Sequence, residues 1–443
     1  MFAARGRRYA FIALILTTVT IMVFTDMTSP DRARAYLDPL LGPVDRGPPK
    51  PKYRPTPAWT PPPVKDPFPA LATSKPPPIP EWNMADDDLH EKYGLDYKPP
   101  LLIGFTRTYP LLLQAVVSYI TAGWPADQIY VVENTGVQRA NLEGRLTLQH
   151  PYFLDHKALE KLGVNVIRTP VLMNFAQLQN FFVHLSHEHS WPYYFWSHMD
   201  VLVLSYEDGN EHTPPYTDPG YKSVYELCLQ ALQNALKTDE RWANRFFSYD
   251  HLALVNRAAY EEVGGWDTFI PYYMNDCDMH SRLLMHNWTQ LDARAGIITD
   301  VSTVLDDLLT LYRDYSIEPK FSDPNPAPPP PPENKRKRDI EVRQEDGGLA
   351  PALAHWKKLQ AVADHMFHYK HGERGRNTWQ EGQQGGKDEP YYYPSHGIAE
   401  AVDVLTEAGR EVFRRKWGHR DCDLQTGAGL VLEDQWLVQK DWH

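Results

Sequence analysis

The chain has few cysteines, and their number and spacing exclude two kinds of small-domain architecture. Only Cys228, Cys277 and Cys422 occur among 443 residues, and no two of them have CxxC spacing. Zinc ribbons and disulfide-dense secreted scaffolds need more cysteines at closer intervals. One disulfide stays open as an expectation for an oxidising compartment, and the sequence does not say which pair would form it.

Positive charge is also in deficit. The 45 lysine and arginine residues are outnumbered by 57 aspartate and glutamate residues, so the formal net charge is -12. Proteins that bind nucleic acid need positive surface to neutralise phosphates, so we do not expect a nucleic acid as a partner. Apolar residues make up 42% of the chain, and its length allows one large domain or two modest ones.

Long apolar runs are missing apart from one near the N-terminus. The stretch Tyr9–Phe24 carries no charge, follows Arg5, Arg7 and Arg8, and is closed by Asp26. As a helix it would span roughly 24 Å, which is short for an average bilayer but tolerable in thinner early secretory membranes. The basic side of such a segment stays in the cytosol, so the rest of the chain is expected in the lumen.

These features predict a cytosolic tail over residues 1–8 and a transmembrane signal anchor over residues 9–25. A cleaved signal peptide is the main alternative, because the run is near the upper length of such segments and an A-x-A-like site lies at Ala33 and Ala35. A buried globular helix is the residual alternative.

Proline is concentrated in two tracts. From Pro39 to Pro80 roughly every third residue is proline, which favours extended polyproline II conformations. We therefore predict a Pro-rich lumenal stem over 26–97, with a ligand for proline-binding modules as the alternative. The second tract joins Pro328–Pro332 to a basic block and predicts a low-complexity insertion over 323–350. The basic block would read as a nuclear signal only outside the lumen.

Short apolar runs alternate with helical stretches after the stem. Strands are expected at Leu101–Phe105, Gln128–Val132, Asn165–Arg168 and Tyr193–Trp196, and helices at Leu111–Tyr119 and Phe175–Ser186. This alternation predicts right-handed βαβ units and a largely parallel α/β sheet. A further strong helix is expected over Ile398–Lys416.

Polar side chains follow three of these strands, at the edge where an open parallel sheet binds its ligand. They are Thr106 and Arg107, Glu133 and Asn134, and the run His198–Asp200. His198 and Asp200 are two residues apart, so on an extended segment they point to the same side and can ligate one divalent cation that neutralises a diphosphate. A surface turn would explain an H-x-D sequence in most other proteins.

A second group of residues lies further along the chain. It reads Gly264-Gly265-Trp266-Asp267, then an aromatic loop, then Asn275-Asp276-Cys277-Asp278 before Arg282. The glycines allow a tight backbone beside a ligand. Carboxylates in the first turn of a helix are favoured by its dipole, and capping alone explains one of them. The other is available as a general base for an acceptor hydroxyl.

The order of these motifs resembles the acceptor-side pattern of GT-A fold glycosyltransferases, in particular family 2-like enzymes. Those enzymes usually carry Gly-Gly-Phe-Asp and Glu-Asp-x-Asp-x-x-x-Arg, where this chain has Gly-Gly-Trp-Asp and Asn-Asp-x-Asp-x-x-x-Arg. Phe246–Arg257 looks like the strand that enters the motif, Asn174–Asn180 resembles the family's helix start, and Phe413–Gly418 resembles a Lys-Trp-Gly element of some members. The resemblance covers about Leu101 to Val304.

The resemblance implies a Rossmann-like nucleotide-diphospho-sugar transferase fold, a mostly parallel sheet with flanking helices after an N-terminal transmembrane helix. Its catalytic domain would span 98–322, and 351–443 would be the C-terminal helical part of that domain. Asp276 matches the catalytic base of inverting members, with Asp278 beside it, and Asp200 matches the second aspartate of the metal motif. The implied donor-binding set is Thr106, Arg107, Glu133, Asn134, Asn174, Gln177, His198, Asp200, Gly265 and Trp266.

Two departures from the family pattern concern metal use. His198 replaces the first aspartate of the metal motif, and Asn275 replaces the glutamate before the base. Imidazole suits softer cations, so Mn2+ is expected at His198 and Asp200 ahead of Mg2+. The family often adds a C-terminal histidine to the metal. The candidates are His365, His368, His371 and His419.

The sequence therefore predicts an inverting, nucleotide-sugar-dependent glycosyltransferase that acts on a glycan, glycoprotein or glycolipid. The anchor and stem predict a single-pass type II protein of the Golgi or endoplasmic reticulum membrane with a lumenal catalytic domain. Two alternatives stay open. One is a degenerate GT-A domain that binds a sugar nucleotide or glycan without turnover, which both departures favour. The other is a structural lumenal protein without a ligand.

Overall fold

The computed structural model describes residues 50–55, 62–322, 350–372 and 388–442, together with Leu14, Leu16, Thr17 and Thr20. The anchor predicted over 9–25 and the insertion predicted over 323–350 lie almost entirely outside the described residues. Among those that are described, no helix is long and apolar enough to cross a membrane. The chain divides into the units Met1–Trp59 and Thr60–His443, and the second unit holds the sheet and its helices.

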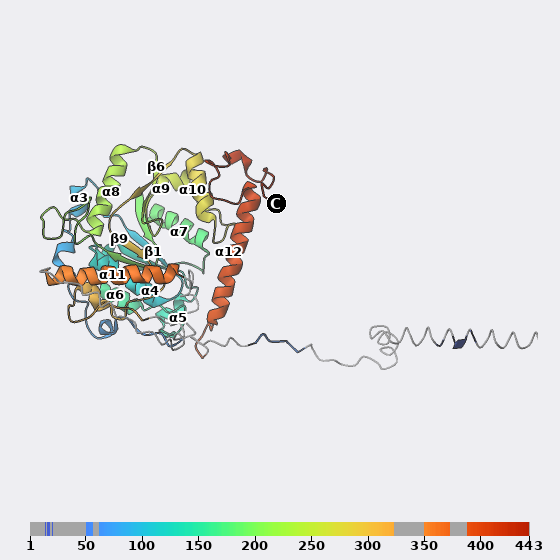
Figure 1. Ribbon diagram of the computed structural model, residues 1–443, viewed down its shortest axis with the longest axis horizontal. Helices are drawn as coiled ribbons and strands as arrows, with labels where there is room; N and C mark the ends of the chain where they lie inside the picture. The colour runs from blue at the N-terminus through green and yellow to red at the C-terminus, as the bar shows by residue number, and fades with distance from the viewer. Residues whose placement is uncertain are drawn as a thin grey trace, which may run out of the picture. The chain divides into compact units, whose positions relative to one another are not determined.

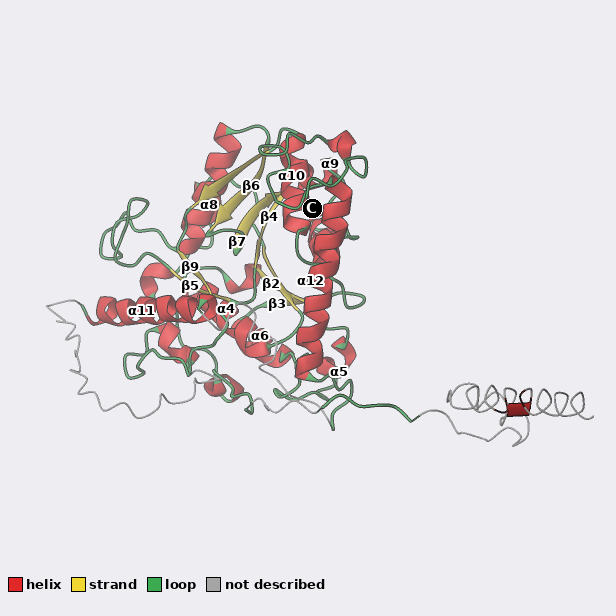
Figure 2. Ribbon diagram, turned by 45° about the vertical axis from the view of Figure 1, so that its right-hand side comes forward, coloured by secondary structure: helices red, strands yellow, loops and turns green. Residues whose placement is uncertain are grey.

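A seven-stranded sheet in the order β3-β2-β1-β4-β7-β6-β8 lies at the centre of the second unit (Figure 2). Its strands are β1 (Leu101–Phe105), β2 (Ile129–Glu133), β3 (Asn165–Arg168), β4 (Tyr193–Ser197), β6 (Trp242–Phe247), β7 (Leu252–Asn256) and β8 (Thr289–Ala293). Neighbouring strands are parallel except that β7 is antiparallel to both β4 and β6. The predicted α/β class and mostly parallel sheet are confirmed.

Helices cover both faces of this sheet (Figures 1 and 2). They are α3 (Leu89–Lys92), α4 (Tyr109–Thr121), α5 (Gln138–Leu142), α6 (His156–Leu162), α7 (Phe175–Glu188), α8 (Val224–Thr238), α9 (Arg257–Glu262), α10 (Asn275–Met285), α11 (Pro351–His371) and α12 (Ser395–Trp417). Short 3-10 turns are η1 (Pro69–Ala72), η2 (Glu81–Asn83), η3 (Ala126–Gln128), η4 (Leu308–Tyr312) and η6 (Leu432–Asp434).

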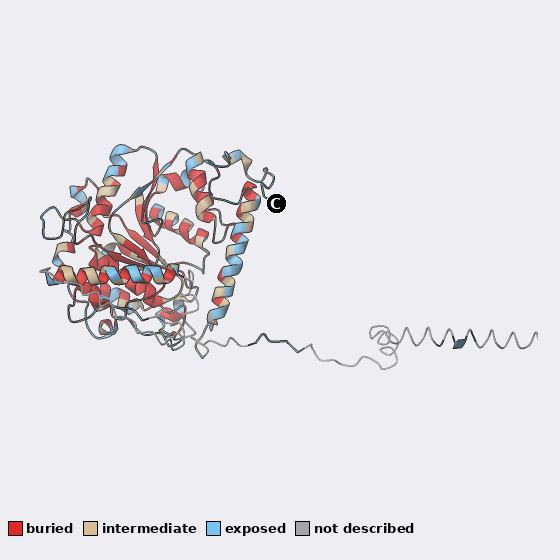
Figure 3. Ribbon diagram, viewed as in Figure 1, coloured by how far each residue is buried: buried red, intermediate tan, exposed pale blue. Residues whose placement is uncertain are grey.

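Alternate residues of each strand serve two hydrophobic clusters, as the period of two along a strand requires. Leu101, Ile103 and Phe105 of β1 join the cluster formed with α4, α6, α8 and α11. Leu102 joins the cluster formed with α7, α9 and α10. The central strands β1, β4 and β7 are consequently buried on both sides, whereas the edge strands β3 and β8 are partly exposed. The outer side of α12 is also exposed (Figure 3).

The strand order reverses between β1 and β4. The chain builds β1, β2 and β3 outward on one side and then returns to place β4 on the other side of β1. At such a reversal the loops that follow two neighbouring parallel strands diverge, which leaves room for a ligand at their carboxyl ends. Here those loops begin at Thr106 and His198.

A second, two-stranded sheet pairs β5 (Val201–Leu204) with β9 (Ile297–Asp300). The strands are antiparallel and Val201 lies opposite Asp300. The backbone N–H of Val301 donates to the carbonyl of Asp200 at 2.9 Å. This register brings Asp200 and Asp300 side by side, although they are far apart in the sequence.

The folded unit begins earlier than the sequence predicts. Phe68, Leu71, Leu89 and Tyr93 are buried in the main hydrophobic cluster. The side chain of Lys161 donates to the carbonyls of Leu71 and Ala72, which fastens η1 to α6. The predicted stem over 26–97 is therefore wrong for residues 62–97. Proline content alone does not predict whether a segment is packed, because an extended segment can still pack when large apolar side chains are spaced along it.

The C-terminal part is tied to α10. Phe413 and Trp417 of α12 are fully buried in a third cluster with Ile270 and Leu424. Cys277 in α10 and Cys422 beyond α12 form a disulfide, and Cys228 is a buried free thiol. The structure thus identifies the pair that the cysteine count left open.

Phe68→Ala should destabilise the folded unit, because Phe68 is 1% exposed and its removal leaves a cavity in the core. The expected loss of unfolding free energy is about 3–5 kcal/mol. Chemical denaturation followed by circular dichroism measures it. Met84→Ala is the matched control within the same segment, because Met84 is 59% exposed. Equal stability of the two variants would contradict this packing and support the stem predicted for residues 62–97.

Candidate functional site

The site is built around Asp200, in the loop that follows β4 at the reversal of strand order. Arg107, from the loop after β1, is half-buried and lies close enough to interact electrostatically with Asp200 and Tyr272. Burial lowers the pKa of Arg107, and these neighbours oppose that shift. The two loops flanking the reversal thus contribute an arginine and a carboxylate to one location, as the sequence predicts.

His198 lies between two carboxylates. Its Nδ1 is 3.7 Å from Asp200 Oδ1, and its Nε2 is 3.6 Å from Asp250 Oδ1. Burial on its own lowers the pKa of His198, but Asp250 and then Asp200 outweigh it and raise that pKa to about 9. The imidazole is therefore cationic at neutral pH, and both ring nitrogens carry protons.

Lys370, at the end of α11, lies between Asp200 and Asp300. Its Nζ donates to Asp200 Oδ2 at 2.7 Å, to Asp300 Oδ1 at 2.5 Å and to the carbonyl of Val301 at 3.3 Å. Burial works to raise the pKa of Asp200, and Lys370 and His198 together lower it. The buried lysine thus helps to hold the Asp200 carboxylate ionised.

Two more histidines approach Asp300. His371 Nε2 is 3.0 Å and His251 Nε2 is 3.8 Å from Asp300 Oδ2. Burial lowers the pKa of His251, and the neighbouring His198 lowers it further. We call the seven residues Asp200, Asp250, Asp300, His198, His251, Lys370 and His371 the Asp200 cluster.

Of the four C-terminal histidines that are candidates for one further metal ligand, only His371 contacts this cluster. His365 packs on the ring of Phe321, and His368 pairs with Asp364 on the surface of α11. His419 bonds Asp423 and Asp441 beyond α12.

The Asp200 cluster does not fit a divalent cation as its residues lie. Such a cation sits about 2.0–2.6 Å from its oxygen ligands, and Lys370 already contacts one oxygen of Asp200 and one of Asp300. In the part of the chain that the structure describes, no three His, Cys, Asp or Glu side chains are arranged to hold a metal ion. His198 and Asp200 do come together as predicted, but the expectation that they bind Mn2+ or Mg2+ stays a prediction.

A tight turn joins the Asp200 cluster to Asp276. The sequence predicts a single strand at Phe246–Arg257, but β6 and β7 form a hairpin whose turn is Ser248–His251. The N–H of His198 donates to the carbonyl of His251 at 3.0 Å, which aligns the turn with the end of β4. The hydroxyl of Tyr249 is 3.4 Å from Asp276 Oδ2, and its ring is 5.9 Å from that of His251.

Left-handed backbone occurs in three of the segments that form the site. Thr108, Ser248, Tyr249 and Met274 have φ values of 67°, 58°, 58° and 72°. Each such non-glycine residue costs roughly 1–2 kcal/mol. Strain of this kind persists only where the surrounding structure imposes it, and it recurs at functional sites. Here it shapes the loop after Arg107, the turn carrying Asp250 and the residue before α10.

Asp276 and Asp278 have different environments because residues two apart on a helix point about 200° away from each other. Asp276 is half-buried and faces Tyr249. Asp278 is fully buried and accepts hydrogen bonds from Arg282, Trp417 and Lys416. These contacts give Asp278 a structural role, and its assignment as a catalytic residue stays a prediction.

The same contacts explain the Lys-Trp-Gly element. Lys416 donates to Asp267 as well as to Asp278, at 2.7 Å and 2.6 Å. The two aspartates of the acceptor-side motif that point inward therefore fix α12 against α10. Figure 1 shows the two helices side by side.

Several predicted donor-binding residues have their side chains engaged within the fold. Glu133 is fully buried and accepts from Thr135, Asn141 and His156. Asn134 bonds both the N–H and the carbonyl of Met173, and it contacts Thr106 Oγ1 at 3.4 Å. Both side chains thus help to close the carboxyl ends of β1, β2 and β3, and their contact with a donor stays a prediction. Thr106 and Arg107 remain at the loop beside Asp200.

The other predicted donor-binding residues, Asn174, Gln177, Gly265 and Trp266, belong to α7 and to the loop before α10. Asn174 and Gln177 form a reciprocal capping box at the start of α7. Asn180 bonds the N–H and the carbonyl of Trp266. A side chain on Gly265 would clash with Asn180, since its Cβ would lie 2.6 Å from Oδ1. These residues position the loop before α10, and none contacts the Asp200 cluster directly.

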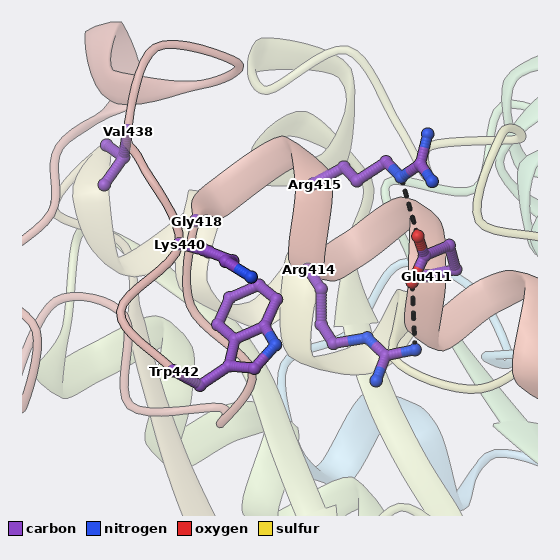
Figure 4. Close-up of a pocket in the computed structure, with 7 residues that line it drawn as sticks. All are labelled: Glu411, Arg414, Arg415, Gly418, Val438, Lys440 and Trp442. Carbon is purple, nitrogen blue, oxygen red and sulfur yellow. Dashed lines mark hydrogen bonds and ion pairs between the residues drawn. The ribbon is translucent and has the colours of Figure 1, made fainter.

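Two cavities lie away from this site. One, of about 410 Å³, lies at the end of α12, where Arg414 and Arg415 both pair with Glu411 (Figure 4). The other, of about 330 Å³, lies over α7 and α9 and includes Asn180 and Gly265. Neither is lined by Asp200, His198 or Asp276. Two of the cations that line the first, Arg414 and Arg415, are already paired with Glu411.

Sequence reasoning missed four members of the site, which are Asp250, His251, Asp300 and Lys370. Asp300 carried no local signal, because only the β5–β9 register brings it to Asp200. Lys370 did carry a local signal, because its spacing continues the buried residues Leu359, Ala363 and Met366 of α11. A helix that faces a core would carry an apolar residue at that position.

No protein-family model and no curated protein matches this chain. Among solved structures, a mannosyltransferase from Pyrobaculum calidifontis in complex with GDP-Man and Mn2+ matches with a TM-score of 0.30 and 12% identity, over 48% of this chain and 58% of its own. A cytidylyltransferase from Leptospira borgpetersenii matches with a TM-score of 0.27 and 9% identity, over 45% of this chain and 81% of its own. Such low TM-scores assign neither an activity nor a ligand.

In chelator-treated protein, the imidazole of His198 should titrate near pH 9 instead of about 6.5. Because the folded pKa is raised, the stabilisation is complete below about pH 6.5 and is lost as the pH rises through 9. The unfolding free energy should therefore fall over this window, and fall less in Asp250→Asn. Histidine NMR signals, assigned with His198→Gln, and denaturation at several pH values measure both effects. A His198 midpoint below pH 7 contradicts this.

Proposed function

We propose that this protein binds a nucleoside-diphosphate sugar beside the Asp200 cluster and transfers the sugar to an acceptor hydroxyl. The observation that carries this is the position of Arg107, His198 and Asp200 in the two loops at the reversal of strand order. Open α/β sheets bind ligands there. Arg107 and the His198 imidazolium bring positive charge, which suits a diphosphate.

In the proposed reaction, Asp276 acts as the general base. The acceptor oxygen forms a bond to the anomeric carbon, its proton passes to the Asp276 carboxylate, and the bond to the diphosphate oxygen breaks. In-line attack inverts the anomeric carbon. Asp276 suits this role because it is half-buried, opens α10 and faces the turn that also carries Asp250 into the Asp200 cluster.

The family resemblance in the motifs is compatible with this geometry. It implies a GT-A fold, a divalent cation and a glycan, glycoprotein or glycolipid acceptor. The residues of the Asp200 cluster do not fit the cation, so no step above depends on one. Thr106 and Arg107 are the predicted donor contacts whose position supports the proposal.

The Cys277–Cys422 disulfide supports a compartment outside the cytosol, because such bonds persist in oxidising surroundings. Together with the sequence signals for an anchor, this agrees with a type II protein of the Golgi or endoplasmic reticulum membrane. Protease protection of the folded unit in sealed microsomes tests that placement.

A binding domain without turnover is the second candidate. The observation that favours it is that Lys370 already forms an ion pair with both Asp200 and Asp300. A donor screen on the purified protein separates the candidates. Uridine, guanosine and cytidine diphosphate sugars are incubated with acceptor mixtures, and release of the nucleoside diphosphate is measured. Release with one donor supports transfer, whereas nucleotide binding without release supports the binding domain.

Asp276→Asn should fold normally and lower turnover by at least about a hundredfold, the usual scale for loss of a general base. Initial rates with the donor found in the screen measure the loss. Asp278→Asn is the matched control in the same helix turn. It should lower the unfolding free energy, because Lys416 and Arg282 lose their buried carboxylate. A folded Asp276→Asn protein with full turnover would remove Asp276 from the mechanism.

A further inference from the structure

We propose that Lys370 takes the place of a divalent cation at the Asp200 cluster, so that the chain binds a nucleoside diphosphate without metal. This inference rests on the proposed function, because it concerns the same donor site. It departs from the metal dependence that the motif resemblance implies. Four features of the structure support it.

The first feature is the saturation of the ammonium group. An ammonium has three N–H donors, and Lys370 directs them to Asp200, Asp300 and the carbonyl of Val301. The carboxylates come from the adjoining ends of β5 and β9, where the strand register fixes their separation. Lys370 therefore occupies the position in which one cation bridges both carboxylates.

The second feature is the rigidity of α11. Lys370 is 3% exposed, and Leu359, Ala363 and Met366 on the same helix face are buried in the main cluster. Near the start of α11, Trp356 Nε1 donates to the carbonyl of Ser205 at 3.0 Å. These contacts fix the position of α11 and thereby hold Lys370 beside the carboxylates.

The third feature is the charge balance. The Lys370 ammonium pairs with the carboxylates of Asp200 and Asp300, and Arg107 is close enough to Asp200 to add a second positive charge. A divalent cation at these carboxylates would lie beside the ammonium, so repulsion between like charges opposes its binding while Lys370 keeps its contacts.

The fourth feature is what stays available for a ligand. All three donors of Lys370 are used, so it neutralises the carboxylates without contacting a phosphate itself. Arg107, in the loop after β1 and close to Asp200, is the cation that we assign to the phosphate. The bridging role thus belongs to Lys370 and the phosphate-binding role to Arg107.

Mn2+ binding to the full, chelator-treated protein tests the proposal, with loss of the free Mn2+ signal in electron paramagnetic resonance as the readout. Wild type should take up no stoichiometric Mn2+. Lys370→Met keeps an apolar chain of similar length and leaves Asp200 and Asp300 unneutralised, so it should gain one Mn2+ site. Lys358→Met is the matched control in α11, because Lys358 pairs with Glu318 on the surface, and it should gain none.

Uptake of one Mn2+ by wild type that Asp200→Asn abolishes would overturn the proposal, because it would show that metal displaces Lys370. This measurement needs no variant of Lys370, so it decides even if Lys370→Met does not fold. It also needs no transfer activity.

Titration of wild type with UDP and GDP in EDTA and in Mn2+ completes the test. The proposal predicts that the dissociation constants differ by less than about twofold between the two conditions. Binding that is at least about tenfold tighter with Mn2+ overturns this inference and leaves the proposed function standing. Absence of binding in both conditions overturns the inference and the proposed function together.

Discussion

The contact between the buried ammonium of Lys370 and the carboxylates of Asp200 and Asp300 is the constraint on which the site depends. Two buried carboxylates this close can both stay ionised only if a cation lies between them. β5 and β9 hold the carboxylates, and the packing of α11 holds the cation. Because the cation is part of the chain, folding of α11 and formation of the site are one event.

The aspartates of the motif between Gly264 and Arg282 have two different roles. Asp267 and Asp278 point inward and receive Lys416 and Trp417, so they anchor α12. Asp276 faces the turn Ser248–His251 instead. The helical geometry of α10 explains why one short motif supplies both roles, since its alternate carboxylates point to opposite sides.

The site joins segments from both ends of the folded unit. The loops after β1 and β4 supply Arg107, His198 and Asp200, while α11 supplies Lys370 and His371. Strained backbone at Thr108, at the hairpin turn and at Met274 fixes the loops between them. Because the surrounding structure imposes these conformations, a ligand would meet a largely preformed arrangement.

The sequence by itself determined the local elements of this protein. The bounds of β1 and β3, the start of α7 and the helix carrying Asp276 were predictable, because periodicity and capping act over a few residues. It also indicated the two loops at the reversal of strand order. Only the tertiary structure decided the partners: that Glu133 and Asn134 serve the fold, that Cys277 pairs with Cys422, and that Lys370 reaches Asp200 from 170 residues away. Strand register and helix packing set those contacts, and neither leaves a local pattern that a single sequence reveals.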